Sequence, residues 1–489
     1  MSDIVPQLWP VLLLPMPLLG ALATLVWRER AHAIGLAASA VLAAGALSLV
    51  VSLSLHGPSR HAMGGWAPPL GIVLRSDGFA GVMVALVVLV AGVLGTGAKA
   101  SFTERMLPVF WPLWLFLQVA LVALFLAGDA FNLYVTLEVL SVSAVALVTL
   151  AGTRDALAAA FRYLLVSLAG SLAYLLGVSL LYNQTGALDL ALLAQRLTPT
   201  AATALAAALM TGGLLLKGAV FPMHFWLPAA HGSAPALVSA ALSGLVVKGA
   251  LYILVRLWTD VFPIARWSMA VDGVAFLGGA AVIWGGIQAI GAARLKLVIA
   301  YSTVAQLGYI GLALPLAARD GAGGTGWRGL TLFLVAHGLA KAGLFASAGA
   351  IQKHAGQDEV RNLAAASAGL PSAMLGIGIA AITLIGLPPS AGFTAKWLLL
   401  ESALAHGQWT TVIVLGAGSL LSAAYLFRVI QPAFVTAAAG DDVPTSVHAV
   451  ALARGGLVLA VASVMLGLLT APILGLLSVG QATPLAASR

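Results

Sequence analysis

The sequence predicts an all-α integral membrane protein with about fourteen transmembrane helices. The 489 residues are 61% hydrophobic and only 8% charged, whereas roughly a quarter of the residues of a soluble domain are charged. The apolar stretches are about twenty residues long, the length that a helix needs to cross a bilayer. Transmembrane strands would be about half as long and would alternate apolar with polar residues, so a β-barrel is excluded.

The fourteen apolar segments are separated by short polar joints, none of which is long enough to bury a core of its own. In chain order, the segments begin near residues 8, 33, 79, 106, 130, 158, 203, 236, 268, 295, 329, 372, 408 and 451. The first segment follows neither a basic leader nor a small-residue cleavage site, so we expect it to be a retained span and not a signal peptide.

The lysines and arginines of the joints predict the orientation. Twelve, including Lys296, lie in odd-numbered loops, and eight lie in even-numbered loops or the tail. By the positive-inside rule the odd-numbered loops are cytoplasmic, which places both termini outside. The formal net charge of +8 is therefore interpreted as membrane topology and not as nucleic-acid binding. The chain has no cysteine, which excludes disulfides, thiolate chemistry and cysteine-ligated clusters.

Five charged residues lie where lipid would be expected. Lys217, Lys248, Lys341, Lys396 and Glu138 all fall inside apolar segments. A charge at mid-membrane costs about 2.5–3.5 kcal/mol on insertion scales, and such residues usually pair, line wet cavities and carry function. The alternative is that the lysines snorkel to an interface, and this alternative has most weight for Lys248 and Lys396, which are nearer a possible boundary.

Three histidines accompany these charges. His337 precedes Lys341 by four residues, so the two share a helix face, a spacing that suits a proton relay. The alternative for His337 is a hydrogen bond between packed helices. His224 and His231 lie on either side of "WLP", and either a relay or a structural role is open to them. No third ligand stands at metal spacing, so no metal site is expected.

Two of the segments are interrupted by helix breakers beside a lysine. The seventh, "LLLKGAVFPMHFWLP", contains Pro222 and Pro228, and the twelfth, "LIGLPPSAGFTAKWLLL", contains Gly386, Pro388, Pro389 and Gly392. Broken helices occur in membranes only where they are buried in protein or line a water-filled cavity. Gly392, four residues before Lys396, is expected to leave room for water. An offset of five spans reverses direction through the membrane, and two such segments at matching places predict an inverted repeat.

These segments resemble the antiporter-like subunits shared by respiratory complex I, membrane-bound hydrogenases and Mrp-type multisubunit cation/proton antiporters. The resemblance rests on "FNLYVTLEVLSVS", "LKGAVFPMHFWLPAAHGSAPALVSAALSGLVVKGALYILVR", "RLKLVIAYSTVAQLGYIGLAL", "AHGLAKAGLFASAGAI" and "GLPPSAGFTAKWLLL". "GGWAPPLGIVLRSDGFAGVMV" looks most like the D-type subunit of Mrp antiporters.

The resemblance implies an organisation and a site. It implies N-terminal helices 1–3 over residues 1–105, a first five-helix repeat (helices 4–8) over 106–258, a second, inverted repeat (helices 9–13) over 268–430, and helix 14 with a tail over 451–489. It also implies proton translocation along a buried row of charged residues that match the family's positions: Glu138, Lys217, Lys248, His337, Lys341 and Lys396.

The function expected from the resemblance is that of a proton-translocating subunit of an Mrp-type cation/proton antiporter, multi-pass in a bacterial inner membrane. Neighbouring antiporter-like and small membrane subunits are expected as partners, with protons and Na+ or K+ as the transported ions and no cofactor. Three alternatives stay open. They are a subunit of a redox-driven pump (complex I or a membrane-bound hydrogenase), a membrane subunit of an inorganic-carbon uptake system, and a passive scaffold in which the lysines only hold helices together.

Overall fold

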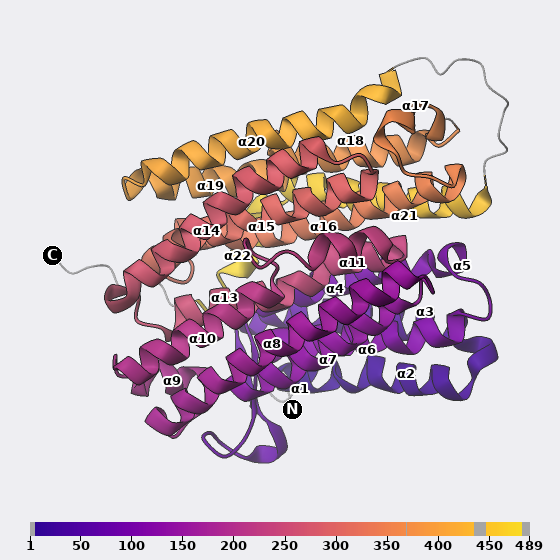
Figure 1. The fold of residues 1–489 in the computed structure, drawn as a ribbon. Coiled ribbons are helices and arrows are strands. Elements are labelled where there is room, and N and C mark those ends of the chain that lie inside the picture. The colour runs from indigo at the N-terminus through magenta and orange to yellow at the C-terminus, as the bar shows by residue number, and fades with distance from the viewer. Residues whose placement is uncertain (1–4, 368, 435–445, 482–489) are drawn as a thin grey trace.

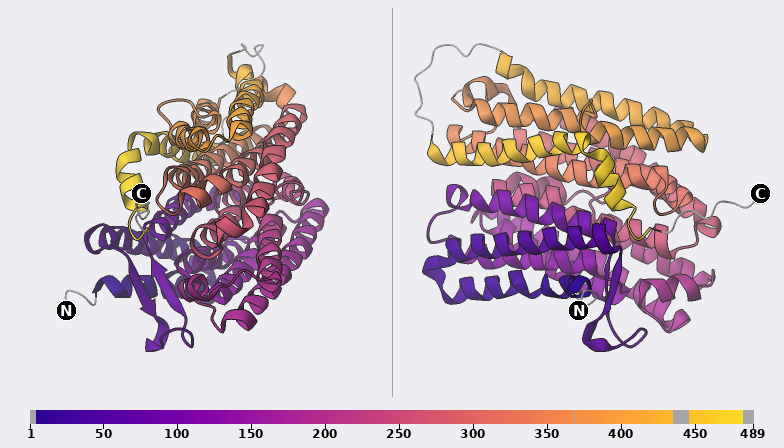
Figure 2. Two further views of the ribbon diagram at one scale, coloured as in Figure 1. Left: turned by 90° about the vertical axis from the view of Figure 1, so that its left-hand side faces the viewer. Right: turned by 180° about the vertical axis from the view of Figure 1, so that it is seen from behind.

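The structure, a computed structural model, describes residues 5–367, 369–434 and 446–481. It is a bundle of long helices that lie alongside one another (Figure 1). The helices of the first half of the chain, indigo to magenta, lie below those of the second half, salmon to yellow, and the view from behind keeps this division (Figure 2). The predicted all-α membrane fold is confirmed.

The first half of the chain begins with long helices. They are α1 (Val5–Leu12), α2 (Pro15–Val26), α3 (Ala31–His56), α4 (Gly78–Thr96), α6 (Leu107–Leu126), α7 (Ala130–Thr149), α8 (Arg154–Thr185) and α10 (Ala201–Lys217), with the short α5 (Ala98–Ser101) and α9 (Leu190–Arg196) between them. The half closes with α11 (Leu227–Ser233) and one continuous span made of α12 (Ala236–Ala241), the π-helix η3 (Leu242–Val246), α13 (Val247–Arg256) and the π-helix η4 (Leu257–Val261).

The second half of the chain also consists mainly of long helices. They are α14 (Ile264–Gly291), α15 (Leu295–Asp320), α16 (Thr325–Ala355), α18 (Pro371–Ile385), α19 (Ala391–Ala405), α20 (Trp409–Ile430), α21 (Val447–Leu468) and the short α17 (Leu363–Ala366) and α22 (Thr470–Leu477). Short 3-10 turns complete the structure at η1 (Arg28–Arg30), η2 (Met63–Gly65), η5 (Val360–Asn362) and η6 (Gln431–Phe434).

Twelve helices in the described part of the chain are long and apolar enough to cross a membrane, judged by length and composition. They coincide with twelve of the fourteen predicted spans. The other two, the seventh and the twelfth, coincide with the shorter apolar helices α10 and α18. The protein is therefore a multi-pass membrane protein, and the count of fourteen depends on whether these two short helices are included.

Both short helices are halves of broken spans, as predicted. α10 ends at Lys217, and the chain is not helical again until α11 begins at Leu227. Pro222 lies inside this break, whereas Pro228 stands in the first turn of α11, where proline is tolerated because its missing N–H needs no helical partner. Pro228 therefore begins a helix and does not break one. In the twelfth span Gly386 ends α18 in a left-handed conformation, with φ 88°.

A two-stranded hairpin lies in the joint after α3 and was not predicted. β1 (Ser59–Ala62) and β2 (Val73–Ser76) pair antiparallel, with Ser59 opposite Ser76. The hairpin projects at the lower edge of Figure 1. We call the end of the bundle that carries it the hairpin face; the even-numbered loops meet there, and the odd-numbered loops meet at the opposite face.

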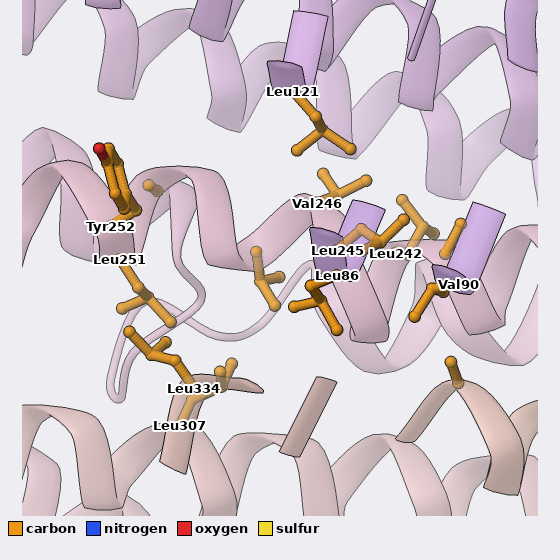
Figure 3. Packing of buried hydrophobic residues seen from close by; sticks show 14 of the residues in the cluster. Leu86, Val90, Leu121, Leu242, Leu245, Val246, Leu251, Tyr252, Leu307 and Leu334 are labelled. Carbon is orange, nitrogen blue, oxygen red and sulfur yellow. The ribbon is translucent and has the colours of Figure 1, made fainter. Parts of the chain in front are cut away.

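The core of the bundle is formed by the spans Ala236–Val261, Leu295–Asp320 and Thr325–Ala355. The most apolar stretches of the first and third are completely buried, and that of the second is 89% buried, so lipid does not reach them. Figure 3 shows the first span held between neighbours: Val246 faces Leu121 from α6, while Leu251 faces Leu334 from α16. A charged side chain on these three spans must therefore find its partners inside the protein.

Candidate functional site

A buried ion pair occupies the first half of the bundle. The Lys217 Nζ donates to Glu138 Oε1 at 2.9 Å and to the Ser141 hydroxyl at 2.8 Å. The Lys217 side chain is 4% exposed and that of Glu138 is 21% exposed. The Ser171 hydroxyl also donates to Glu138. The pair lies close to the middle of α7.

Helix packing positions this pair. Glu138 lies at the centre of α7, and Lys217 is the last residue of α10, where the carbonyl ends of the helix favour a cation. α8 and α10 approach as closely as backbones can, because a Cβ on Gly213 would lie 2.3 Å from the Gly170 carbonyl oxygen. The indole of Trp226, beyond the break, donates to the Leu216 carbonyl at 3.0 Å. The Leu216 carbonyl also accepts from the Ala219 N–H at 3.3 Å, so this polar group beside the break is satisfied inside the protein, as burial in a membrane requires.

Lys248 lies at mid-span, twelve residues after Ala236 and thirteen before Val261. It is fully buried, and its Nζ donates to the Ser243 carbonyl. Ser243 belongs to the π-helix η3, a local widening that changes which carbonyls the helix uses and that is frequent at functional sites. The lysine thus points into the protein and does not snorkel, which removes the main alternative for this residue.

A continuous row of polar atoms joins Lys248 to Lys341. Ser243, whose carbonyl binds Lys248, also has its hydroxyl 3.0 Å from the Thr303 hydroxyl on α15. The Thr303 hydroxyl donates to the Ile299 carbonyl at 2.9 Å, and the Lys341 Nζ donates to the same carbonyl at 3.1 Å. Lys341, fully buried, is therefore linked to Lys248 through two hydroxyls and two carbonyls, those of Ser243 and Ile299.

The row continues beyond Lys341. Its Nζ also donates to the Ser302 hydroxyl, and Gln306 is the next polar residue on this side of α15, one turn after Ser302. The Gln306 amide donates to Tyr425 at 3.4 Å and to the Leu384 carbonyl at 3.2 Å. Leu384 is in the last turn of α18, so the row reaches the second helix break.

Lys396 ends this row. Its Nζ donates to the carbonyls of Leu384 at 3.2 Å and Ile385 at 3.0 Å and to the Ser419 hydroxyl at 3.0 Å, and it lies 4.4 Å from the centre of the Tyr309 ring. The helix break therefore supplies the carbonyls that hold this lysine.

The prediction that Gly392 leaves room for water beside Lys396 is wrong. A Cβ at this position would lie 1.9 Å from the Thr383 carbonyl oxygen. The lack of a side chain at Gly392 allows two backbones to approach closely, and protein fills the space in which water was expected.

The histidines are buried, and none pairs with a lysine in the described part of the chain. His337 is 2% exposed, one turn before Lys341, and stacks on Phe333; neither of its ring nitrogens has a hydrogen-bond partner among the described residues. His231 stacks on Phe345 with ring centres 4.7 Å apart. His224 packs against Trp284. No three His, Cys, Asp or Glu side chains among the described residues lie close enough to hold a metal ion.

Lys296 is a fifth buried lysine, which the sequence pattern assigned to a loop. It stands in the first turn of α15, is 3% exposed, and donates to the Ala234 carbonyl at 2.9 Å. It lines a cavity of about 800 Å³ at the face opposite the hairpin, together with Arg162 and Ser233. Ala234 follows α11, the helix that carries His231 one turn earlier. The only sequence signal was that the lysine directly adjoins an apolar run.

The chain is similar in sequence and in fold to known membrane proteins. The model of a family described as NADH:quinone oxidoreductase/Mrp antiporter, transmembrane, matches residues 127–422. The chain is 37% identical to the N subunit of the NADH-quinone oxidoreductase of Desulforudis audaxviator, over 82% of this chain and 80% of the relative. It is 29% identical to the D-type subunit of the Na+/H+ antiporter of Alkalihalophilus pseudofirmus, over 79% and 78% of the two chains. A chain in the structure of the Mrp complex from a Dietzia species superposes with a TM-score of 0.88 at 26% identity, over 97% of this chain and 96% of that chain.

Proposed function

Because this chain belongs to the NADH:quinone oxidoreductase/Mrp antiporter family, we propose that it is a proton-translocating membrane subunit of a multisubunit Mrp-type cation/proton antiporter. The fold supports this assignment because the likeness to a chain of an Mrp complex extends over nearly all of both chains. The proposed location is a bacterial cell membrane, with other membrane subunits as partners and protons and Na+ or K+ as the ions of the whole complex.

The observation that carries the proposal is the row of amines at mid-membrane. Lys248 and Lys341 are joined by hydrogen-bonding groups, Lys396 shares the Leu384 carbonyl with Gln306, and Lys217 pairs with a carboxylate. An amine can both hold and release a proton, so a row of amines can transfer protons without covalent chemistry. The proposed path uses, in order, Glu138 with Lys217, then Lys248, Lys341 with His337, and Lys396.

Glu138 is proposed to act as the switch of the path. Of the four lysines, Lys217 alone pairs with a carboxylate in the described part of the chain. When this pair is closed, the carboxylate stabilises the charged amine; when it opens, the amine loses that stabilisation and becomes a proton donor. Movement of a partner subunit against α7 is one way to open it, since Glu138 is the more exposed of the two side chains.

The way into the path is proposed to be the cavity that Lys296 lines. This cavity lies on the face of the odd-numbered loops, which the lysine and arginine distribution assigns to the cytoplasm. His231 is buried one turn along α11 from the carbonyl that Lys296 binds, and it is the proposed intermediate between the cavity and the lysines. The two inverted repeats, 106–258 and 268–430, and the placement of both termini outside are parts of the same proposal.

The test of this function is the variant Lys217→Ala in the whole complex. We expect proton-coupled cation transport in vesicles to be lost while the complex still assembles, because the path loses its first amine. Lys353→Ala is the matched control, because Lys353 is an exposed lysine at the end of α16. Transport at the wild-type rate in an assembled Lys217→Ala complex would exclude the relay and favour a scaffold role.

A second function is supported by a specific observation. The relative at 37% identity is a subunit of a quinone oxidoreductase, so the same relay can serve a redox-driven pump. The two functions differ in the partners that co-purify with the chain. Small antiporter subunits would support the antiporter, and quinone-reducing or hydrogenase subunits would support the pump.

A further inference from the structure

A cluster of four charges lies where the lysine-bearing helix α13 reaches the hairpin face. Arg256 contacts Asp77 at 2.5 Å and Asp260 at 3.3 Å. Arg75, on strand β2, contacts the same two carboxylates at 2.9 and 2.7 Å. Each aspartate therefore binds both arginines, and the four charges form a closed, neutral ring, which we call the charge ring.

Arg256, the member of the charge ring that belongs to α13, lies on the same side of this helix as Lys248. Lys248, Tyr252 and Arg256 are spaced four residues apart, so their side chains lie above one another along the helix. All three are buried, with at most 3% exposure. The Tyr252 hydroxyl accepts from the Arg256 guanidinium at 3.0 Å and donates to the Phe125 carbonyl at 2.8 Å. This side of α13 extends from the middle of the bundle to the hairpin face.

Beyond the ring lies an open cavity of about 630 Å³. Arg75, Asp77 and Asp260 line it, together with Arg60 and the loops that meet at the hairpin face. Exposure falls across the ring, from 25% for the Arg75 side chain to 3% for that of Arg256. The ring is therefore the boundary between this cavity and the buried face that leads to Lys248.

The residues of the charge ring are unsuited to passing a proton on. A guanidinium does not release its proton at physiological pH, so neither arginine can hand a proton on, and each carboxylate of the ring is held between two guanidiniums. Burial acts to raise the pKa of Asp77, but the adjacent Arg256 and Arg75 outweigh it and lower that pKa below its ordinary value. The carboxylate thus stays ionised. Phe79 and Tyr252 pack against the Arg256 guanidinium, with ring centres 5.0 and 5.1 Å away.

We propose that the charge ring of Arg75, Asp77, Arg256 and Asp260 is a seal that closes the direct route between the hairpin-face cavity and Lys248. Protons then leave the first half of the path only by passing along the polar row towards Lys396. Without the seal, Lys248 would exchange protons with the cavity, and the coupling of proton flow to the rest of the complex would be lost. This inference rests on the proposed function in taking Lys248 as a member of the path.

The experiment measures passive proton flux in vesicles that hold the whole complex, with a pH gradient imposed and no cation gradient or electron donor present. Arg256→Gln removes the fixed charge and keeps hydrogen-bonding groups. We expect the flux to rise at least about tenfold, because Asp77 loses one of the two guanidiniums that keep it ionised and can then take up a proton. Arg256→Lys keeps a positive charge beside Asp77, so its flux is expected to stay below that of Arg256→Gln. Arg361→Gln, which breaks the exposed ion pair with Glu359 at the opposite face, is the control and is expected not to leak.

A double variant separates an opened route from a disrupted structure. If protons leak through Lys248, adding Lys248→Ala to Arg256→Gln should return the flux to the wild-type level. An assembled Arg256→Gln complex without a leak, or a double variant that leaks as much as the single one, would overturn the seal. Neither result would contradict the proposed function, which is tested separately by Lys217→Ala. Arg75→Gln, at the more exposed rim, tests the same idea if Arg256→Gln does not assemble, and absence of a leak there would again contradict it.

Discussion

Replacing Glu138 by glutamine removes the one carboxylate that pairs with a lysine of the path in the described residues. The distance from Lys217 Nζ to Glu138 Oε1 is 2.9 Å, which corresponds to about 6 kcal/mol of attraction at an effective dielectric of about 20. Because the Glu138 side chain is 21% exposed, we reduce this by roughly half, to about 3 kcal/mol, to allow for solvent screening. Glutamine has nearly the same shape and still accepts from Ser171 and Lys217, so the variant isolates the charge.

The expected result is a loss of proton-coupled transport. A change of about 3 kcal/mol alters the balance between the charged and the neutral lysine by roughly a hundredfold, so Lys217 no longer retains a proton until the pair opens. The assay is proton flux driven by a cation gradient in vesicles, at matched amounts of assembled complex. Glu138→Gln is expected to lower the initial rate by one to two orders of magnitude, in line with a roughly hundredfold change.

The aspartate variant provides the internal control. Glu138→Asp keeps the charge and shortens the side chain by one methylene, which places the carboxylate about 1.5 Å farther away and leaves roughly two thirds of the attraction. Its transport is therefore expected to fall between that of the wild type and that of Glu138→Gln. Equal rates for glutamine and glutamate at this position would refute the switch, and equal rates for glutamine and aspartate would show that geometry matters and charge does not.

Three further variants, at two positions, test the ends of the path. Lys396→Ala and Lys396→Arg are both expected to abolish net proton transfer, because arginine hardly ever gives up a proton; full transport by the arginine variant would instead assign Lys396 to anchoring, and His337 with Lys341 would then be the next candidates for the exit. Lys296→Gln keeps a donor for the Ala234 carbonyl and is expected to slow proton uptake from the face opposite the hairpin several-fold without affecting assembly. An unchanged rate, measured from each side of oriented vesicles, would remove Lys296 from the path.

The broken helices and the mid-membrane charges could be predicted because their signals are local. Pro388, Pro389 and Gly386 oppose a helix whatever surrounds them, and a lysine within an apolar run has few structural explanations. That Lys217 and Glu138 would find partners inside the protein was expected, because charges at mid-membrane usually pair or line wet cavities. The long helices followed from length and hydrophobicity alone, and the structure agrees with the predicted segments.

Other parts of the site could not be predicted in this way. The polar row depends on Ser243, Thr303 and Gln306, and neutral polar residues occur in many membrane helices without any function. The hairpin brings Arg75 to Asp260, 185 residues farther along the chain, and no local pattern encodes that contact. Lys296 was assigned to a loop because a lysine at the start of a span looks the same whether it faces solvent or a buried carbonyl.

The two halves of the path hold their lysines by different means, and this difference places the switch. Lys217 has an anionic partner, whereas Lys248, Lys341 and Lys396 have only carbonyls and hydroxyls among the described residues. Neutral acceptors compensate a buried charge less well than an ion pair does. A proton on the row beyond Lys217 is therefore held less tightly than one at the Glu138 pair, and it can move along the row once it has left that pair. The step that needs external work is the separation of Lys217 from Glu138, and the charge ring keeps the proton released by that step from escaping directly to the hairpin face.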